Sequence, residues 1–336
     1  MTLEPEDGSK QLHVVRTIFH DQDPCHARPR SIRVPYHYTL CWPRATRAAV
    51  SRLIVRPSSL AVIGLGAIGG SLAWQARLAG VQRVVGYSPE RSEGIQALKA
   101  SAITDLADNP LSAVRGADLV VLAVPPRPTL DLITRLASAL EPDALLTDVC
   151  SVKAPVLKQA LAAGLGHRFA GAHPLAGTHE TGFTSARPDR LKGCVVYICE
   201  SGTPEGHRAA DSVTSFWRHT LEASPIRIAA QDHDRQLAWT SHLPQAVAYA
   251  LARSLADHGL GGVSYGSGAK DTTRLAASNP DMWVDILLYN EPAVSEALGQ
   301  TEAHLAELRR LLATGDAPGL RAYLCAAQSF RKGIEG

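Results

Sequence analysis

Apolar residues in the middle of the chain fall into short continuous runs, separated by longer stretches with helical spacing. The runs at 60–63, 83–87, 118–124 and 144–149 have the length and composition of buried strands. Strands that alternate with helices in this way form a parallel sheet with helices on its faces. Two later runs, 170–172 and 195–198, are expected to extend the sheet. The pattern predicts an α/β Rossmann domain, with a doubly wound and mostly parallel sheet, over residues 58–229.

Beyond residue 229 the apolar positions take helical spacing only. They form one stripe across residues 231–257 and another after residue 290, with the members Leu237, Leu243, Val247, Leu251 and Leu255, then Val294, Leu298, Leu305, Leu308 and Leu312. These stripes hold more apolar surface than one small bundle buries by itself. The sequence therefore predicts an all-helical domain over residues 230–336.

The first 57 residues differ from both patterns. Residues 26–57 contain seven arginines and no Asp or Glu, and they show no sustained period of helix or strand. We interpret residues 1–57 as a disordered or non-native N-terminal extension. An organelle transit peptide, which is also rich in arginine and poor in acids, is the alternative interpretation.

Composition excludes several classes of function. The 336 residues include 34 Lys and Arg against 32 Asp and Glu, so a net charge of +2 gives no global field toward nucleic acid or an anionic membrane surface. The chain contains no run of about 18 apolar residues, so no membrane-spanning helix is predicted. The six cysteines form no CxxC pair and no cluster with histidines at metal-ligand spacing, so no metal site is expected. A small-molecule substrate and a cytoplasmic location fit these features.

A glycine-rich turn follows the first apolar run directly. Residues 64–70 read Gly-Leu-Gly-Ala-Ile-Gly-Gly, and a helix-like segment comes next. In a strand–turn–helix unit, Gly64 supplies the backbone angles, Gly66 lets the main chain approach a pyrophosphate, and Gly69 lets helix and strand pack closely. The following strand arrives at the distance of a βαβ unit. We therefore expect a nicotinamide dinucleotide to bind at Gly64, Gly66, Ile68 and Gly69.

The ends of the next two strands bear on which dinucleotide is bound. NAD-binding units usually end the second strand with an acid that accepts a hydrogen bond from the ribose 2′-hydroxyl. Ser88 stands there in this chain, with Arg91 three residues later, and this pair suits a 2′-phosphate. The sequence thus favours NADP over NAD; the alternative is NAD, with Glu90 at the ribose. Val124 and Pro125, after the following strand, are expected to line the cofactor crevice.

Five motifs after the turn suggest a reaction. They are DVCSVK at 148–153, GAHPLAG at 171–177, SHLP at 241–244, KDTTRLA at 270–276 and MWVDI at 282–286. With these motifs in this order, the chain resembles the prephenate and arogenate dehydrogenases of tyrosine biosynthesis from residue 60 to about residue 312. That family oxidises a cyclohexadienyl alcohol with a nicotinamide cofactor while the ring carboxylate leaves as CO2. The resemblance implies a prephenate dehydrogenase, with arogenate or dual cyclohexadienyl specificity as the alternative.

The reaction removes a proton from the substrate hydroxyl, so the site needs a base with a pKa near neutrality. Histidine is the usual choice, and His173 occupies the family's catalytic position. Ser151 matches the family's serine, and the resemblance implies that it orients and tunes His173 through a hydrogen bond. Ser151 can also cap the helix expected to begin near residue 154.

Substrate carboxylates need a cation with the fork geometry of guanidinium. Arg274 matches the family's substrate arginine, and Lys270, four residues earlier, adds positive charge on the same helix face. His242 matches a family histidine. Where many members have a second histidine this chain has Gln245, which does not titrate, so the choice between prephenate and arogenate stays open. The resemblance also implies a homodimer with the active site between domains.

Three other interpretations compete with this one. A β-hydroxyacid-type dehydrogenase would typically use a lysine base. A non-catalytic NAD(P)-sensing binding protein would not need Ser151, His173 and Arg274 together. An enzyme of specialised metabolism that acts on an amino-substituted prephenate analogue fits the same residues.

Overall fold

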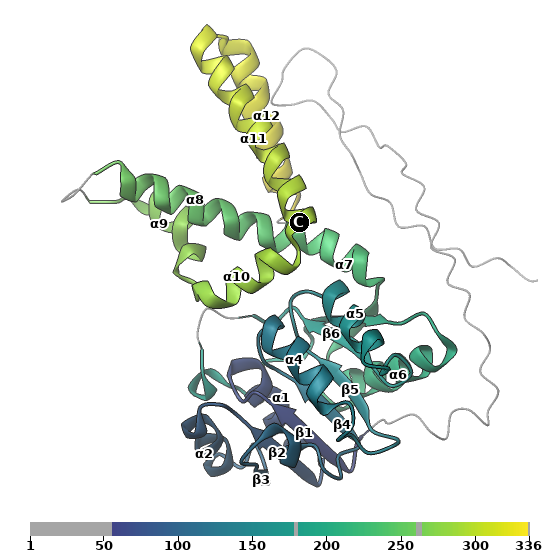
Figure 1. The fold of residues 1–336 in the computed structure, drawn as a ribbon. Coiled ribbons are helices and arrows are strands. Elements are labelled where there is room, and N and C mark those ends of the chain that lie inside the picture. The colour runs from purple at the N-terminus through teal and green to yellow at the C-terminus, as the bar shows by residue number, and fades with distance from the viewer. Residues whose placement is uncertain (1–55, 178–180, 260–263, 335–336) are drawn as a thin grey trace, which may run out of the picture. The chain divides into compact units, whose positions relative to one another are not determined.

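The computed structural model describes residues 56–177, 181–259 and 264–334 (Figure 1). Its contacts divide the chain into two compact units, one spanning Arg47–Leu298 and one that includes Gly299–Gly336. The first unit carries both sheets and most of the helices. The extension predicted for residues 1–57 lies outside the described residues, except for Arg56 and Pro57.

The larger sheet has five parallel strands in the order β3-β2-β1-β4-β5. Its strands are β1 (Ser59–Ile63), β2 (Arg83–Tyr87), β3 (Asp105–Leu106), β4 (Leu119–Leu122) and β5 (Leu145–Asp148). The four apolar runs that predicted strands all form them, and the short β3 is an addition. The parallel order, which reverses direction at β1, confirms the Rossmann class of fold.

Five helices cover the two faces of this sheet. They are α1 (Ala67–Leu78), α2 (Arg91–Lys99), α3 (Pro110–Ala113), α4 (Pro126–Leu136) and α5 (Ala154–Ala162). Alternate residues of β1 point to opposite faces, as in any strand. Leu60 and Val62 pack in one core with α1 and α2, while Ala61 and Ile63 pack in the other with α3, α4 and α5.

The two later apolar runs form strands of a second sheet and do not extend the first sheet. This sheet has the order β6-β7-β8, with β6 (Ala170–Pro174) antiparallel to β7 (Val195–Glu200) and β7 parallel to β8 (Ser224–Arg227). A single bridge between Leu146 and Phe169 connects β5 with the start of β6. The expectation of one continuous sheet was therefore wrong in detail. Helix α6 (Pro204–Ser215), with a π-helical turn at Phe216–Thr220, lies between β7 and β8 in the sequence.

Helices alone follow β8, as the apolar spacing predicted. They are α7 (Ala230–Leu237), α8 (Leu243–Asp257), α9 (Ser267–Thr273), α10 (Pro280–Tyr289), α11 (Glu291–Thr314) and α12 (Ala317–Gly333). A π-helical turn, Ala238–His242, joins α7 to α8, and a 3-10 turn, Arg274–Ala277, follows α9. Among the described residues, none of the helices combines the length and apolar character that crossing a membrane requires.

Candidate active site

The turn between β1 and α1 has the backbone that its glycines predict. Gly64 adopts φ +100°, and a Cβ there would lie 2.3 Å from the carbonyl oxygen of Ala123. A Cβ at Gly69 would lie 1.9 Å from the carbonyl oxygen of Gly64. At Gly66 an added Cβ would meet no atom within 4 Å, so the main chain is open to a ligand there. Two positions that only glycine fits and one open approach suit a bound pyrophosphate.

The predicted neighbours of this turn lie where strand ends place them. Ile68, in the first turn of α1, and Val124, just after β4, are both half-buried. Val124 lies against Gly64, since its Cγ1 would be 2.9 Å from a Cβ at that glycine. Pro125 is exposed and precedes the first residue of α4. These positions are compatible with a cofactor that lies over the turn.

The end of β2 carries a carboxylate that the sequence reading did not place there. Ser88 is buried, and its hydroxyl donates a 2.6 Å hydrogen bond to Oε2 of Glu93, in the first turn of α2. Arg91 is exposed, and its guanidinium pairs with Asp108 at 2.9 Å. Glu90 is exposed as well. The group that Ser88 contacts is therefore a carboxylate, and the nearby arginine forms an exposed ion pair with Asp108.

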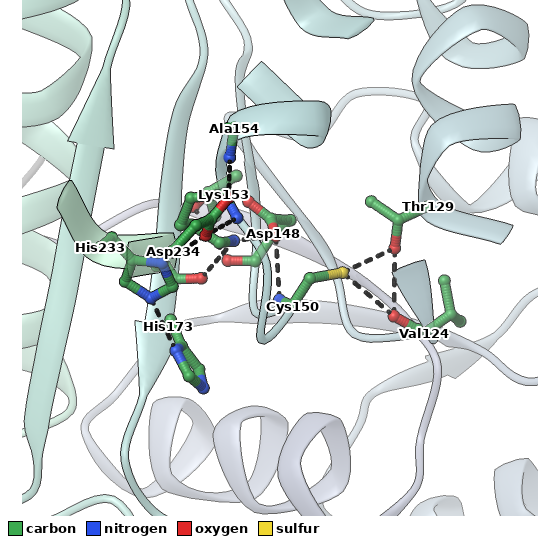
Figure 2. Close-up of polar contacts among 11 residues, drawn as sticks. Val124, Thr129, Asp148, Cys150, Lys153, Ala154, His173, His233 and Asp234 are labelled. Carbon is green, nitrogen blue, oxygen red and sulfur yellow. Dashed lines mark hydrogen bonds and ion pairs between the residues drawn. The ribbon is translucent and has the colours of Figure 1, made fainter. Parts of the chain in front are cut away.

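His173 lies near the end of β6 and is buried. Its Nδ1 is 2.9 Å from Nε2 of His233, in α7, and Figure 2 shows its other ring nitrogen pointing away from His233. Ser151 is half-buried, and within the described part of the chain it makes neither the expected hydrogen bond to His173 nor the expected helix cap. The residue that hydrogen-bonds to His173 in the structure is therefore His233, and not Ser151 as the sequence predicted.

Asp234 takes the capping role at the start of α5. Its Oδ1 accepts hydrogen bonds from the Lys153 backbone N–H and from Nδ1 of His233, both at 2.7 Å, and its Oδ2 accepts from the Ala154 backbone N–H at 2.8 Å. A carboxylate at a helix N-terminus is stabilised by the free N–H groups and the helix dipole. Helix α7 is thereby held against the loop that follows β5 (Figure 2).

A buried ion pair anchors the same loop to β6. The ammonium of Lys153 contacts Oδ2 of Asp148 and donates a 2.8 Å hydrogen bond to the carbonyl oxygen of Ala172, next to His173. Both side chains are almost fully buried, and Oδ2 of Asp148 also accepts from the Cys150 backbone N–H at 2.9 Å. A charge pair with these additional hydrogen bonds tolerates burial. The ion pair fixes the backbone that presents His173.

His242 lies at the end of the π-helical turn before α8 and is fully buried. Its Nδ1 is 3.0 Å from Nδ2 of Asn290, which also donates a 2.7 Å hydrogen bond to the backbone carbonyl of Asp234. An amide nitrogen is a donor only, so Nδ1 of His242 accepts. A neutral ring then carries its proton on Nε2. That atom is buried and has no hydrogen-bond partner among the described residues.

The remaining predicted residues fall into two groups. Gln245 is buried, and its amide donates a 2.6 Å hydrogen bond to the carbonyl oxygen of Leu275. Lys270 and Arg274 are both exposed, and within the described residues neither forms an ion pair. Lys270 borders a hollow between α8 and α9 that Ala252, Leu255, Ala256, Tyr265, Ala269 and Thr273 also line. Arg274 is the C-cap of α9 and begins the 3-10 turn that follows it.

Burial keeps the three histidines of this network neutral. It lowers the pKa of His173 well below the ordinary value, and the neighbouring His233 lowers it further. Burial also lowers the pKa of His233, although its hydrogen bond to Asp234 acts in the opposite direction. The pKa of His242 falls to about 4, again mainly through burial. Each ring therefore carries one proton, and its hydrogen-bond partners decide which nitrogen holds it.

Sequence reasoning missed the groups that tie the histidines together: His233, Asp234 and Asn290. The adjacent His233 and Asp234 stand at the start of a predicted helix, where a histidine beside a carboxylate was a usable signal. Asn290 gave no such signal, because its partner His242 lies 48 positions earlier in the chain.

A Rossmann sheet with a dinucleotide turn, joined to a buried neutral histidine near a strand end, defines a nicotinamide-dependent dehydrogenase. The chain belongs to the prephenate dehydrogenase family. Residues 72–223 match the model for the prephenate dehydrogenase nucleotide-binding domain, and residues 229–326 match the model for its dimerization domain. The predicted family, the fold class and the use of NAD or NADP are thereby confirmed.

Two curated relatives are similar over most of their length. The prephenate dehydrogenase of Bacillus subtilis is 29% identical over 283 residues, which cover 82% of this chain and 76% of the relative. The cyclohexadienyl dehydrogenase of Zymomonas mobilis is 32% identical over 287 residues, covering 82% and 96%.

Two solved structures are also similar to this chain. The prephenate dehydrogenase from Aquifex aeolicus, in complex with hydroxyphenyl propionate and NAD+, has a TM-score of 0.76 and 28% identity, covering 82% of this chain and 98% of that one. The arogenate dehydrogenase of Synechocystis has a TM-score of 0.68 and 27% identity, covering 82% and 99%.

Proposed function

We propose that this protein oxidises prephenate to 4-hydroxyphenylpyruvate with loss of CO2, in tyrosine biosynthesis. The observation that carries the proposal is His173, a buried and neutral imidazole within a hydrogen-bonded network in a chain of this family. When bound, NAD(P)+ supplies the hydride acceptor. His173 takes the proton of the ring hydroxyl as the carbinol carbon loses hydride, and the ring carboxylate leaves as CO2.

Two further residues are proposed to hold the substrate. His242 offers a buried Nε2–H that has no partner among the described residues, which suits a carbonyl or carboxylate oxygen. Arg274 offers an exposed guanidinium that no described carboxylate pairs. Lys270 adds positive charge near it, and Ser151 lies close in sequence to the anchored Lys153. We keep Ser151 as a catalytic candidate because it matches the serine of the family.

Gln245 bears on the alternative substrate. Its amide is bonded to the Leu275 carbonyl, so it braces the segment that carries Arg274 and does not present a free charge to the substrate side chain. The second candidate is arogenate or dual cyclohexadienyl specificity. The name of the Zymomonas mobilis relative, a cyclohexadienyl dehydrogenase, supports it.

A cofactor-reduction assay tests the proposal. Purified protein is offered prephenate or arogenate, each with NAD or NADP, and the reduced nicotinamide is followed by absorbance. We expect turnover with prephenate. Turnover with arogenate alone selects the second candidate, and no turnover with any pair refutes both.

For the cofactor we propose NAD, in contrast to the preference for NADP inferred from sequence. The Glu93 carboxylate accepts from Ser88 at the end of β2, where a 2′-phosphate would meet a like charge. Arg91, the expected phosphate ligand, is paired with Asp108. A ribose hydroxyl, which donates, suits this arrangement better than a phosphate.

Binding of the two reduced cofactors tests this preference without turnover. We expect tighter binding of NADH than of NADPH by fluorescence titration, and we expect Glu93→Gln to narrow the difference. Glu302→Gln removes an exposed acid on α11 that has no proposed role in cofactor binding and is the control. Tighter binding of NADPH by the unmodified protein would restore the original preference.

We also propose a homodimer formed through residues 230–336, beside a dinucleotide-binding domain of residues 58–229. The matched dimerization model supports this, as do several apolar side chains of α11 and α12 that are more than half exposed, namely Leu305, Leu312, Leu324 and Phe330. A monomer by sedimentation at micromolar concentration would contradict the proposed dimer.

We also propose a cytoplasmic location, because the reaction draws on a nicotinamide pool. Cell fractionation tests this location.

A further inference from the structure

The hydrogen bonds around His233 leave a single arrangement of protons. Asp234 accepts from two backbone N–H groups as well as from His233, and a carboxylate in this setting only accepts. Nδ1 of His233 must therefore be the donor. In a neutral ring the other nitrogen, Nε2, then has no proton and is an acceptor.

The same reasoning passes on to His173. Because Nε2 of His233 accepts, the nitrogen 2.9 Å away, Nδ1 of His173, must carry a proton and donate it. Burial and the neighbouring charges keep His173 neutral, so its Nε2 carries a free lone pair. The network thus selects one of the two tautomers of His173.

We propose that Asp234 and His233 are positioning residues that hold the proton of His173 on Nδ1 and leave its Nε2 free to accept the proton of the substrate hydroxyl. Asp234 orients His233, and His233 orients His173. When Nε2 takes the substrate proton, the positive ring keeps its Nδ1–H bond to His233, whose other nitrogen faces the Asp234 carboxylate. The inference rests on the proposed function and names two residues that act through His173.

The surroundings of His233 support a role beyond packing. Besides His173 and Asp234, the charged or titratable groups acting on it are Lys153 and Asp148, and the ring of Tyr197 packs edge-on with a centroid distance of 5.5 Å. Lys153 pairs with Asp148, and Asp234 is the carboxylate that bonds the ring directly. A ring whose two nitrogens are both committed is oriented, and an oriented partner can fix a second ring.

Two substitutions at position 233 separate orientation from packing. His233→Leu fills the space but cannot bond to either neighbour. His233→Gln carries an oxygen that can accept from His173 and an amide N–H that can donate to Asp234. We expect His233→Leu to lower kcat by at least about tenfold, because a misoriented base loses far more than this in the serine protease triad. We expect KM and NADH binding to stay within about twofold, and His233→Gln to recover most of kcat.

The same measurement of kcat supplies a control and the outcomes that would contradict the inference. Tyr197→Phe removes a hydroxyl that accepts a 2.5 Å hydrogen bond from Gln236 beside His233, and it should leave kcat unchanged. Equal losses in His233→Leu and His233→Gln, or wild-type kcat in His233→Leu, would overturn the inference. If His233→Leu lacks the wild-type thermal transition, His233→Asn replaces it, since its shorter amide cannot span both neighbours.

A second readout keeps the inference separate from the proposed reaction. If the unmodified protein turns over no substrate, the proposed function fails, and histidine-selective 15N NMR still reports the tautomer of His173. We expect the unprotonated Nε2 in the unmodified protein and in His233→Gln, and a mixed signal in His233→Leu. The opposite tautomer in the unmodified protein overturns the inference by itself.

Discussion

His173 and His242 lie at opposite ends of one buried polar network, and both are connected to Asp234. His173 reaches it through the side chain of His233, and His242 reaches it through Asn290. His233 accepts from the first ring, whereas Asn290 donates to the second. Nε2 of His173 is therefore an acceptor, and Nε2 of His242 is a donor. The comparison teaches that two neutral histidines acquire opposite functions from the partner of the other ring nitrogen.

The largest effect is expected at the accepting end. His173→Asn removes the base and should lower kcat by at least about a hundredfold, the usual scale for a general base. Affinity for NADH by fluorescence titration should not change. His167→Asn, at an exposed histidine, is the control. A kcat within tenfold of the unmodified protein would remove His173 from the reaction.

Arg274, outside this network, is proposed to act on substrate binding instead. Arg274→Ala removes a guanidinium and should raise KM by roughly 10–100-fold with little change in kcat, because a hydrogen bond to a charged group contributes about 1.5–3 kcal/mol. Initial rates over a range of substrate concentrations measure this. Arg253→Ala, which breaks an exposed pair with Asp257 on α8, is the matched control. An unchanged KM would contradict the assigned role.

Burial of His173 and His242 should make the folded protein less stable at acidic pH. A histidine with an unfolded-state pKa of about 6.5 contributes full stability above that pH when burial depresses its folded-state pKa. The contribution is lost as the pH falls through 6.5 toward the folded value, which is about 4 for His242. We expect the free energy of unfolding in urea to fall by roughly 2 kcal/mol between pH 7 and pH 5 through His242 alone. In His242→Gln the fall should be smaller by this amount, and equal curves would contradict the account.

The smallest effect is expected from replacing His242, whose Nε2–H is the proposed donor to the substrate. His242→Phe removes one neutral hydrogen bond to the substrate and should raise KM by roughly fivefold, about 1 kcal/mol. His242→Gln can accept from Asn290 and still donate, so its KM should stay near that of the unmodified protein. A selective loss of kcat in His242→Phe would assign this histidine to proton transfer and erase the contrast with His173.

The two regions also differ in what the sequence could predict. The glycine turn was found because its signal is local: a strand, a turn and a helix within 20 residues. His173 was found because its motif resembles that of the family. His233 was missed because it lies 60 positions after the residue that it orients. Contacts at that separation depend on how α7 packs, which no local pattern encodes.

The end of β2 shows the same limit at shorter range. Ser88 and Arg91 were placed correctly after a strand, and from their types alone they favoured NADP. Because α2 begins at Arg91, its first turn brings the Glu93 carboxylate to Ser88 and directs Arg91 toward Asp108. Knowing the helix start was necessary to tell which charge lies beside Ser88.

Histidine-selective 15N NMR at pH 7 tests the opposite polarity of the two rings most directly. Long-range correlations distinguish protonated from unprotonated ring nitrogens, and the variants His173→Asn and His242→Gln assign the signals. The account predicts an unprotonated Nε2 in His173 and a protonated Nε2 in His242. The same tautomer in both rings, or a doubly protonated His173, would contradict it.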